Sequence, residues 1–454
     1  MRLGWRRFAL LAALVVLAGG VRWVAMWATD PVRLVGDENY YGMTGLQIAQ
    51  GRGHIGGVSS HASRAWRPPA HSYVLSLFAD PNLPLNEPNL RAYVRRLLLL
   101  QVGLSAGLVA LTLLLGRALF DERVGWLAGA IAALYPAFIA HSHYLWSETL
   151  FAVWVVGALL AVIEVERRRS WLIASVAGVA FGIATLTRET ALPVAAVAAV
   201  WWVWTAAPAQ RPRARLQGAL MLALAILVVV PWTVRNYRVL DRFVPVSTVG
   251  WFAAGEGNTL EHPNWLRPEG PAQRAFHSAY YEITDEGERF DFARRHTLDR
   301  IAAEQPTWIL KKTLRSLAQL WSPDAVLLYK LRRGAYGEVP AWIEHTATLA
   351  SVLTYAGVLA AGVLGIATAH GSGRRLLPCL ILGVVMALHV FANATARFRM
   401  PWMPLLIVYA SYALIRGRSL GRDLRGWRWI APAGVLLFFF AVCVPYFVAF
   451  GGRQ

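Results

Sequence analysis

Long apolar stretches alternate with short polar connections along almost the whole chain. Each stretch approaches the length of about 20 residues that a helix needs to cross a bilayer. The predicted fold is therefore an all-α polytopic membrane protein, a bundle of about eleven transmembrane helices. The predicted spans are 8–28, 95–119, 124–140, 148–165, 171–187, 190–206, 217–235, 346–369, 376–394, 400–416 and 428–450.

Two connections are much longer than the rest. They run over residues 30–91 and 236–345. They divide the chain into an N-terminal transmembrane module, 1–236, which contains the first long loop; a loop region, 237–345; and a C-terminal transmembrane module, 346–454.

The second long loop carries helical patterns of its own. In "FDFARRHTLDRIAAEQPTWILKKTLRSLAQLW" the apolar residues recur at helical spacing, with Arg and Lys between them. Such a pattern is typical of a helix that lies in the membrane interface. The apolar residues expected to share this face are Phe292, Ile301, Ile309, Leu310, Leu314 and Leu317.

Composition agrees with a membrane protein. Of 454 residues, 56% are hydrophobic and only 16% charged, and the mean hydropathy is +0.43. The net charge of +19 is concentrated in arginine clusters between apolar stretches, the pattern of cytoplasmic loops rather than of a nucleic-acid-binding surface. These clusters predict a cytoplasmic N-terminus, an odd number of spans, and an extracytoplasmic side that holds both long loops and the C-terminus.

The first apolar stretch has two interpretations. Arg2, Arg6 and Arg7 precede it, as in a cleaved signal peptide. The stretch continues through "VRWVAMWA" without a clear small-residue cleavage site, which favours a retained span. In that case Arg22 is expected to extend its side chain to the outer interface.

Polar residues near bilayer depth are costly and mark functional sites. In this chain they gather toward the outer side, whereas the inner loops hold arginines without a comparable mixture of acids and histidines. The outer residues are Asp37, Glu38, Arg64, Arg67, His71, His141, His143, Glu148, Arg188, Glu189, Arg235, Arg397 and Arg399. The outer face is therefore the predicted working side.

Each of these residues also has a purely structural interpretation. Asp37 could be only a helix N-cap. Arg188 and Glu189 could form a local ion pair, and Arg397 with Arg399 could contact lipid headgroups. The pair His141 and His143, with Glu148, could merely solvate a turn.

A stripe in the ninth span favours a functional interpretation. His389, Asn393 and Arg397 are spaced four residues apart and so would share one helix face. Several arginines around one outer cavity suit phosphate, because the guanidinium offers several donors at once. A carboxylate beside them could accept a proton from a hydroxyl group.

A metal is a second use for the same acids. The candidates for binding a divalent ion are Asp37, His141, His143 and Glu148. No ligand spacing in the sequence demands one, so no cofactor is assigned.

Four segments together resemble the GT-C membrane glycosyltransferases, in particular the branch of the dolichyl-phosphate-mannose protein mannosyltransferases and the lipid A aminoarabinose transferases. They are "GDENYY" and "AWRPPAHSYVL" in the first outer loop, "PWTVRNYRVLDRFVPVSTVGWFAAGEGN" after the seventh span, and "ARFRMPWMPLL" at a late span. The resemblance runs from about residue 30 to 415.

The resemblance implies inverting transfer of a sugar from a polyprenyl-phosphate donor at the extracytoplasmic face. It assigns Asp37 to activation of the acceptor hydroxyl, with Glu38 as its neighbour, and Arg67 to the donor phosphate. The other candidates for donor-phosphate or substrate binding are Tyr41, His71, Glu148, Arg188, Arg235, His389, Arg397 and Arg399.

The chain departs from the lipid A transferases at two points. Asn39-Tyr40-Tyr41 stands where they carry a basic residue, and Arg67 precedes Pro-Pro where they usually carry Lys. The acceptor therefore stays open among an envelope lipid, glycan or protein. The alternatives to an enzyme are a lipid-linked-glycan flippase or transporter and a non-catalytic membrane subunit. The arginine-rich, lysine-poor composition points to a bacterial source and hence to the inner membrane.

Overall fold

Helices make up the regular structure of the protein. The computed structural model describes residues 4–28, 34, 36–56, 63–82, 87–259, 270–323, 331, 337–369, 373–420, 424 and 429–450. Within these ranges the only extended pairing between segments is an isolated antiparallel bridge between Gly56 and Ser63. The expected all-α class is confirmed.

Every predicted span contains helix. Among the described residues, six helices are long and apolar enough to cross a membrane, and four further apolar helices are shorter. The helices in the predicted spans are α1 (Trp5–Trp27), α4 (Glu87–Leu119), α5 (Glu122–Leu134) with α6 (Pro136–His141), α7 (Glu148–Arg168), α8 (Trp171–Thr187), α9 (Ala191–Thr205), α10 (Arg211–Leu240), α16 (Ala341–Thr368), α17 (Gly373–Phe391), α18 (Met403–Arg416), and α20 (Ile430–Phe438) with α21 (Val444–Phe450). The chain is a multi-pass membrane protein.

The third predicted span is broken in two. Tyr135 has extended backbone angles, φ −67° and ψ 115°, and Pro136 starts the short helix α6. Proline disfavours helical angles in the residue before it and suits the first position of a new helix. The break opens the turn that leads through residues 142–147 to α7.

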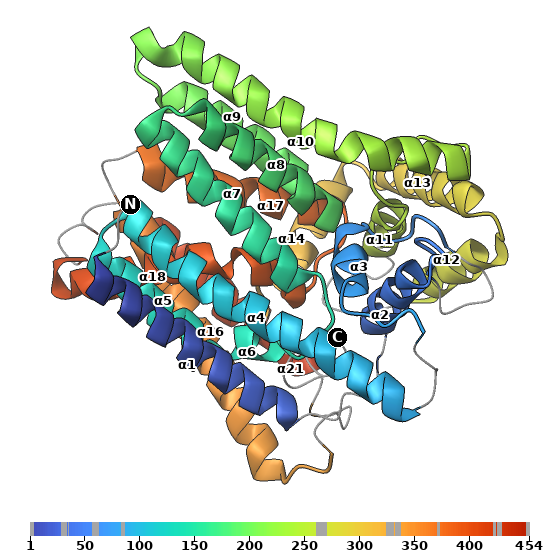
Figure 1. Ribbon diagram of the computed structural model, residues 1–454, viewed down its shortest axis with the longest axis horizontal. Helices are drawn as coiled ribbons and strands as arrows, with labels where there is room; N and C mark the ends of the chain where they lie inside the picture. The colour runs from blue at the N-terminus through green and yellow to red at the C-terminus, as the bar shows by residue number, and fades with distance from the viewer. Residues whose placement is uncertain are drawn as a thin grey trace.

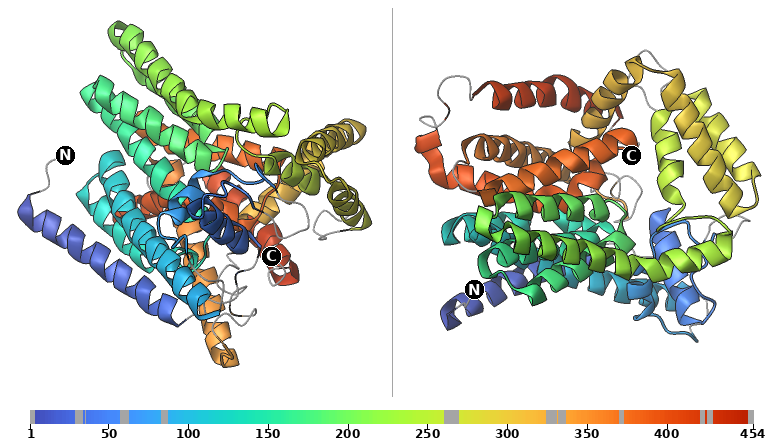
Figure 2. Two further views of the ribbon diagram at one scale, coloured as in Figure 1. Left: turned by 45° about the vertical axis from the view of Figure 1, so that its right-hand side comes forward. Right: turned by 90° about the horizontal axis from the view of Figure 1, so that it is seen from above.

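The helices of the two long loops lie together at one end of the bundle. They are α2 (Asp37–Ala49), α3 (Ala70–Ser76), α11 (Val249–Asn258), α12 (Pro271–Glu282), α13 (Glu286–Ala303) and α14 (Thr307–Trp321). Figures 1 and 2 show α2, α3 and α11 to α13 at this end, with the start of α1 at the opposite end. Both long loops therefore share one side of the bundle.

The helical pattern over residues 290–321 belongs to two helices. α13 ends at Ala303 and α14 begins at Thr307, after Pro306. The six apolar residues expected on one face are split between two axes, so that expectation is wrong. Ile309 and Leu310 on α14 are exposed, at 54% and 65%.

Small residues let the spanning helices approach closely. A Cβ atom added to Gly182 on α8 would lie 2.6 Å from Cβ of Val228 on α10, and one added to Gly178 would lie 2.6 Å from the Met221 carbonyl oxygen. Lipid tails are as apolar as leucine, so such close packing is a main source of association between membrane helices.

Arg22 does not reach the outer interface as expected. Its side chain is fully buried, and it donates hydrogen bonds to Oγ of Ser105 at 2.7 Å and to the carbonyl oxygens of Ala133 at 2.8 Å and Ala132 at 3.1 Å. These carbonyls are left without helical partners where α5 breaks, so the guanidinium satisfies them. Arg22 thereby ties α1 into the bundle.

The contact between α16 and α18 gives a test of the glycine packing. A Cβ at Gly365 would lie 2.1 Å from the carbonyl oxygen of Tyr409, whereas one at Gly357 on the same helix meets nothing within 4 Å. We expect Gly365→Ala to lower the free energy of unfolding by about 1–3 kcal/mol through overpacking. Gly357→Ala should be neutral or stabilising, by up to about 1 kcal/mol, because alanine favours the helix. Thermal unfolding of the detergent-solubilised protein measures both, and equal melting temperatures would contradict the close contact.

Candidate active site

Asp37 is the first residue of α2, directly after Gly36. Gly36 takes a positive φ of 58° and occupies the N-cap position, so Asp37 is not the cap. Its carboxylate accepts hydrogen bonds from two arginines instead: Oδ1 from Nη2 of Arg67 and Oδ2 from Nη2 of Arg397. Both carboxylate oxygens of Asp37 are thus engaged, and the side chain is 15% exposed.

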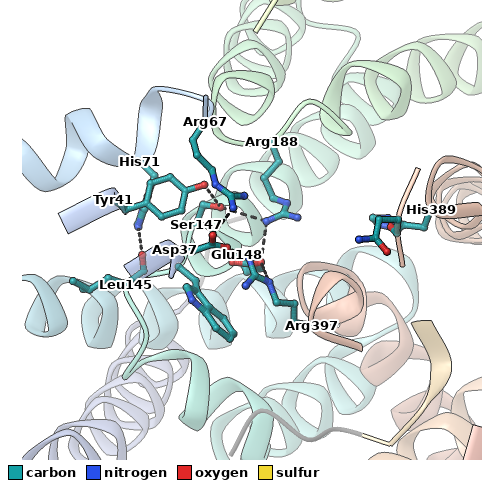
Figure 3. A network of polar contacts seen from close by, with 12 residues as sticks. Asp37, Tyr41, Arg67, His71, Leu145, Ser147, Glu148, Arg188, His389 and Arg397 are labelled. Carbon is teal, nitrogen blue, oxygen red and sulfur yellow. Dashed lines mark hydrogen bonds and ion pairs between the residues drawn. The ribbon is translucent and has the colours of Figure 1, made fainter. Parts of the chain in front are cut away.

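Glu148 is the second carboxylate of the cluster. It lies in the first turn of α7 and is fully buried. Its Oε1 accepts hydrogen bonds from Nη1 of Arg188 and from Nε of Arg397, both at 2.9 Å. Arg397 therefore bridges Glu148 and Asp37, as Figure 3 shows.

The structure corrects the expected stripe in the ninth span. α17 ends at Phe391, and Arg397 lies in a separate 3₁₀ segment, Ala396–Trp402. His389 and Arg397 are consequently not on one helix face. The ring of His389 stacks on Phe398 with centroids 5.4 Å apart, and Figure 3 shows it apart from the ion-pair network. The helix break is what lets Arg397 turn toward the two carboxylates.

Aromatic rings surround the guanidinium groups. The Cζ atom of Arg397 lies 4.2 Å from the ring centre of Trp146, and that of Arg188 lies 4.9 Å from the ring centre of Phe398. Cations are attracted to the faces of such rings, and the rings limit water. Charge interactions inside this setting are stronger than at a solvated surface.

Glu38 and His71 hold the turn that precedes α7. Oε1 of Glu38 accepts a hydrogen bond from the backbone N–H of Leu145 at 3.2 Å. Nε2 of His71 lies 3.2 Å from the Leu145 carbonyl oxygen. Burial lowers the pKa of His71 to about 4, so the ring is neutral and donates through Nε2. Both residues therefore support the site from behind the cluster.

Tyr41 connects this support to the charged residues. Its ring meets that of His71 edge to face, with centroids 4.8 Å apart. Its hydroxyl donates to Oγ of Ser147 at 3.3 Å, and Nη1 of Arg188 lies 3.4 Å from the same oxygen. Ser147 is thus a polar link between the first outer loop and Arg188.

The electrostatic balance of the cluster favours an anion. Three guanidinium groups face two carboxylates, which leaves an excess of one positive charge. Burial by itself would raise the pKa of Asp37, but Arg67 and Arg397 outweigh it and hold that pKa well below the usual range for aspartate. Nε of Arg67 is buried and has no hydrogen-bond partner among the described residues. The cluster can therefore bind a further acceptor of hydrogen bonds.

Two predicted arginines lie outside the cluster. Arg235 donates to the carbonyl oxygen of Arg64 at 2.7 Å and stacks over Trp232. Arg399 is buried, and its Nη1 donates to the carbonyl oxygens of Leu320 and Ser322. Each satisfies backbone groups elsewhere, so of the four outer arginines expected at the donor phosphate only Arg67 and Arg397 have side chains in this cluster.

The candidate metal ligands do not form one group. His141 places Nδ1 2.8 Å from the Ala137 carbonyl oxygen, and His143 places Nε2 3.2 Å from the Arg22 carbonyl oxygen. Among the described residues no three His, Cys, Asp or Glu side chains come together as a metal site. Asp37 and Glu148 are joined by an arginine instead. These four candidates are therefore not arranged as one metal site.

Some contacts of the site were not anticipated from the sequence. Arg188 pairs with Glu148 and not with its neighbour Glu189, which accepts from Oγ of Ser247 at 2.5 Å. Trp146, which directly precedes Ser147 and Glu148, is not among the residues that the sequence pattern singles out. An aromatic residue and a hydroxyl beside a buried acid were the available signal.

Comparison with known proteins places this site in a family context. The family model described as dolichyl-phosphate-mannose-protein mannosyltransferase matches residues 67–234. That segment begins at Arg67 and includes Glu148 and Arg188. A search among curated proteins finds no match.

Several solved structures share the arrangement of helices. The archaeal oligosaccharyltransferase AglB from Archaeoglobus fulgidus, in complex with an inhibitory peptide and a dolichol-phosphate, is 17% identical over 99% of this chain and 56% of its own, with a TM-score of 0.56. The same enzyme in complex with Zn and sulfate gives 16% identity, 97% and 53% coverage, and a TM-score of 0.55. The chain thus spans about half the length of these oligosaccharyltransferases.

A bacterial enzyme matches more weakly. ArnT from Cupriavidus metallidurans bound to undecaprenyl phosphate is 14% identical over 89% of this chain and 78% of its own, with a TM-score of 0.40. The oligosaccharyltransferase structures match the helix arrangement over almost the whole of this chain. Together with the family model, they show that this chain has the GT-C fold of membrane glycosyltransferases.

Proposed function

We propose that this protein is an inverting glycosyltransferase that moves a sugar from a polyprenyl-phosphate donor to a hydroxyl group of a cell-envelope acceptor. The observation that carries the proposal is the cluster of Asp37 and Glu148 with three arginines, at the end of the bundle where the long loops lie. The resemblance to an oligosaccharyltransferase whose structure holds a dolichol-phosphate supports a lipid-linked donor.

The donor phosphate would bind to the arginines. Arg67, Arg188 and Arg397 come from three distant parts of the chain and carry one positive charge more than the two carboxylates balance. Arg67 also has an unused buried donor, Nε. Guanidinium groups bind phosphate oxygens with paired, charge-assisted hydrogen bonds. The lipid tail would remain in the bilayer beside the spanning helices.

Asp37 would accept the proton of the acceptor hydroxyl. The hydroxyl oxygen forms a bond to the anomeric carbon of the sugar, and the bond from that carbon to the phosphate oxygen breaks. The polyprenyl phosphate leaves with the electron pair, and the proton moves to the Asp37 carboxylate. A single displacement inverts the anomeric centre. Arginines that hold the leaving phosphate act most strongly as its charge develops.

Donor binding would also activate the base. In the free protein both Asp37 oxygens accept from arginines, which makes the carboxylate a weak base. A phosphate that draws Arg67 and Arg397 toward itself releases those oxygens and adds negative charge nearby. Both effects raise the affinity of Asp37 for a proton. The base would thus become effective only when the donor is in place.

The proposed location is a bacterial inner membrane, with the N-terminus in the cytoplasm and the site on the outer side. The arginine-rich inner connections support this orientation. Cysteines introduced into residues 87–91 or 236–245 should react with an impermeant thiol reagent in intact cells. Labelling only of cysteines placed at Arg167–Arg169 would reverse the orientation.

Removal of the proposed base is the first test. Asp37→Asn keeps the size of the side chain and removes its charge. We expect a folded protein whose transfer rate falls roughly 100-fold or more, the scale of a lost general base. Sugar transfer from a polyprenyl-phosphate sugar measures this, with Asp80→Asn, an exposed aspartate of the same loop, as the control. Normal turnover by Asp37→Asn would assign that carboxylate a structural role.

The pH profile of the parent protein gives a second reading of the same group. Asp37 accepts a proton only while ionised, so activity is lost as the pH falls through its pKa. The arginines depress that pKa in the free protein, so kcat/KM for the donor should keep its value to lower pH than kcat, which reports the donor complex. If kcat/KM and kcat decline at the same acidic pH, donor binding does not raise the pKa of Asp37, and activation by the donor is contradicted.

Arginine replacements test the phosphate site. Arg67→Ala or Arg397→Ala should lose about 2–4 kcal/mol of transition-state stabilisation, the range for one preorganised donor. Arg67→Lys and Arg397→Lys keep the charge but lose the planar fork, so partial activity should remain. The control is Arg52→Ala, which removes an exposed arginine of the same outer side. If single-turnover transfer by the Ala variants equals that of the parent, the donor phosphate does not bind to these arginines and its site must be sought elsewhere in the protein.

A further inference from the structure

Glu286 joins the two long outer loops at the segment that carries Arg67. It lies in the first turn of α13, where Asp285 caps the helix, and is only 5% exposed. Its carboxylate accepts hydrogen bonds from the backbone N–H groups of Arg64 at 2.5 Å and Ala65 at 3.1 Å. Burying a charged group is costly without hydrogen bonds, so the two amides stabilise Glu286 at this buried position.

A third donor completes the set. The Thr248 hydroxyl donates to Oε1 of Glu286 at 2.9 Å. The Thr248 backbone N–H also donates to the Ala65 carbonyl oxygen at 2.8 Å, and the Val249 N–H donates to the Trp66 carbonyl oxygen at 3.2 Å. Glu286 and the start of α11 therefore hold residues 64–66 from two sides.

Other groups use the remaining backbone of this segment. Ser63 pairs with Gly56 through two backbone hydrogen bonds, and the Arg64 carbonyl oxygen accepts from Nη1 of Arg235 at 2.7 Å. Arg289 on α13 donates to Oγ of Ser63 at 3.3 Å. Segment 63–66 is thus fixed along its length by Gly56 of its own loop, by Arg235 on α10 and by the second long loop.

Arg67 follows this segment directly and precedes two prolines. Proline fixes its own φ and restricts the residue before it to extended angles. The backbone of Arg67 is therefore held by hydrogen bonds on one side and by Pro68-Pro69 on the other. Only its side chain remains to move between Asp37 and a ligand.

We propose that Glu286 is a positioning residue for the phosphate site. Its hydrogen bonds to the Arg64 and Ala65 amides set where Arg67 lies. The second long loop is therefore part of the donor-binding machinery. The inference rests on the proposed role of Arg67 in binding the donor phosphate. The Glu286 carboxylate accepts hydrogen bonds from two backbone amides and a hydroxyl. Among the described residues it forms no hydrogen bond or ion pair with Arg67 or Asp37.

The test compares two glutamates in the same helical turn. The hydrogen bonds that Arg64, Ala65 and Thr248 donate to Glu286 form a clamp on the segment before Arg67. Glu286→Gln removes the charge and one acceptor of this clamp. Glu288→Gln makes the same change at an exposed position, so it controls for the helix dipole. Binding of a radiolabelled polyprenyl phosphate to the full-length protein should weaken roughly 10-fold in Glu286→Gln, the scale for losing an orienting partner behind a ligand. Glu288→Gln should bind like the parent.

A double-mutant comparison separates positioning from general stability. If Glu286 acts through Arg67, Glu286→Gln should weaken phosphate binding much less in an Arg67→Ala background than in the parent. Full additivity, or parent-like binding by Glu286→Gln, would overturn the inference. Thr248→Val removes the third donor of the clamp with little change in volume and gives the same comparison if Glu286→Gln fails to fold.

The Arg67→Ala variant also distinguishes the two proposals. If Arg67→Ala alone binds polyprenyl phosphate as well as the parent does, the phosphate site itself is misplaced and the role of Glu286 falls with it. If Arg67→Ala loses binding while Glu286→Gln and Thr248→Val keep it, the phosphate site stands and only the positioning role is wrong.

Discussion

The bridge that Arg397 makes between Asp37 and Glu148 is the interaction on which the site depends. Two carboxylates in a largely apolar setting repel each other and are poorly hydrated, so each needs a cation nearby. Arg397 serves both, with Arg67 and Arg188 completing the balance. Removing one partner would leave a buried charge unpaired, which is far costlier than the small net gain of forming the pair. The bridge therefore joins the first outer loop, α7 and the C-terminal module.

The same balance suits the cluster to the anion that the proposed function requires. Each carboxylate is paired with two of the arginines, yet the arginines keep an excess of positive charge and an unused donor on Arg67. In the proposed function, a phosphate would enter by exchange and replace a carboxylate as the partner of a guanidinium. Aromatic rings at Trp146 and Phe398 hold the cations without competing as acceptors. Such a preorganised site needs little rearrangement when charge develops on a leaving group.

The scaffold around the cluster consists of hydrogen bonds, most of them to backbone groups, and of close helix packing. The turn before α7 is fixed by His71, Glu38 and Tyr41. Glycine contacts hold α8, which ends directly before Arg188, against α10. On the other side, Glu286 ties the backbone before Arg67 to the large outer loop. A movement of that loop would shift Arg67 at the proposed phosphate site through these backbone hydrogen bonds, without direct contact between the loop and the ligand.

The sequence by itself determined the membrane class, the helical spans, the shared side of the two long loops, and the choice of Asp37, Arg67 and Arg397 as candidates for one site. Apolar length and polar residues near bilayer depth can both be recognised in short segments of the chain. Only the tertiary structure decided which partners meet. Arg235 and Arg399 look equivalent to Arg397 in the sequence, yet they satisfy backbone carbonyls elsewhere. The break after Phe391 turns Arg397 toward the carboxylates. Pairings between residues hundreds of positions apart follow from helix packing, and helix packing has no local signature in the chain.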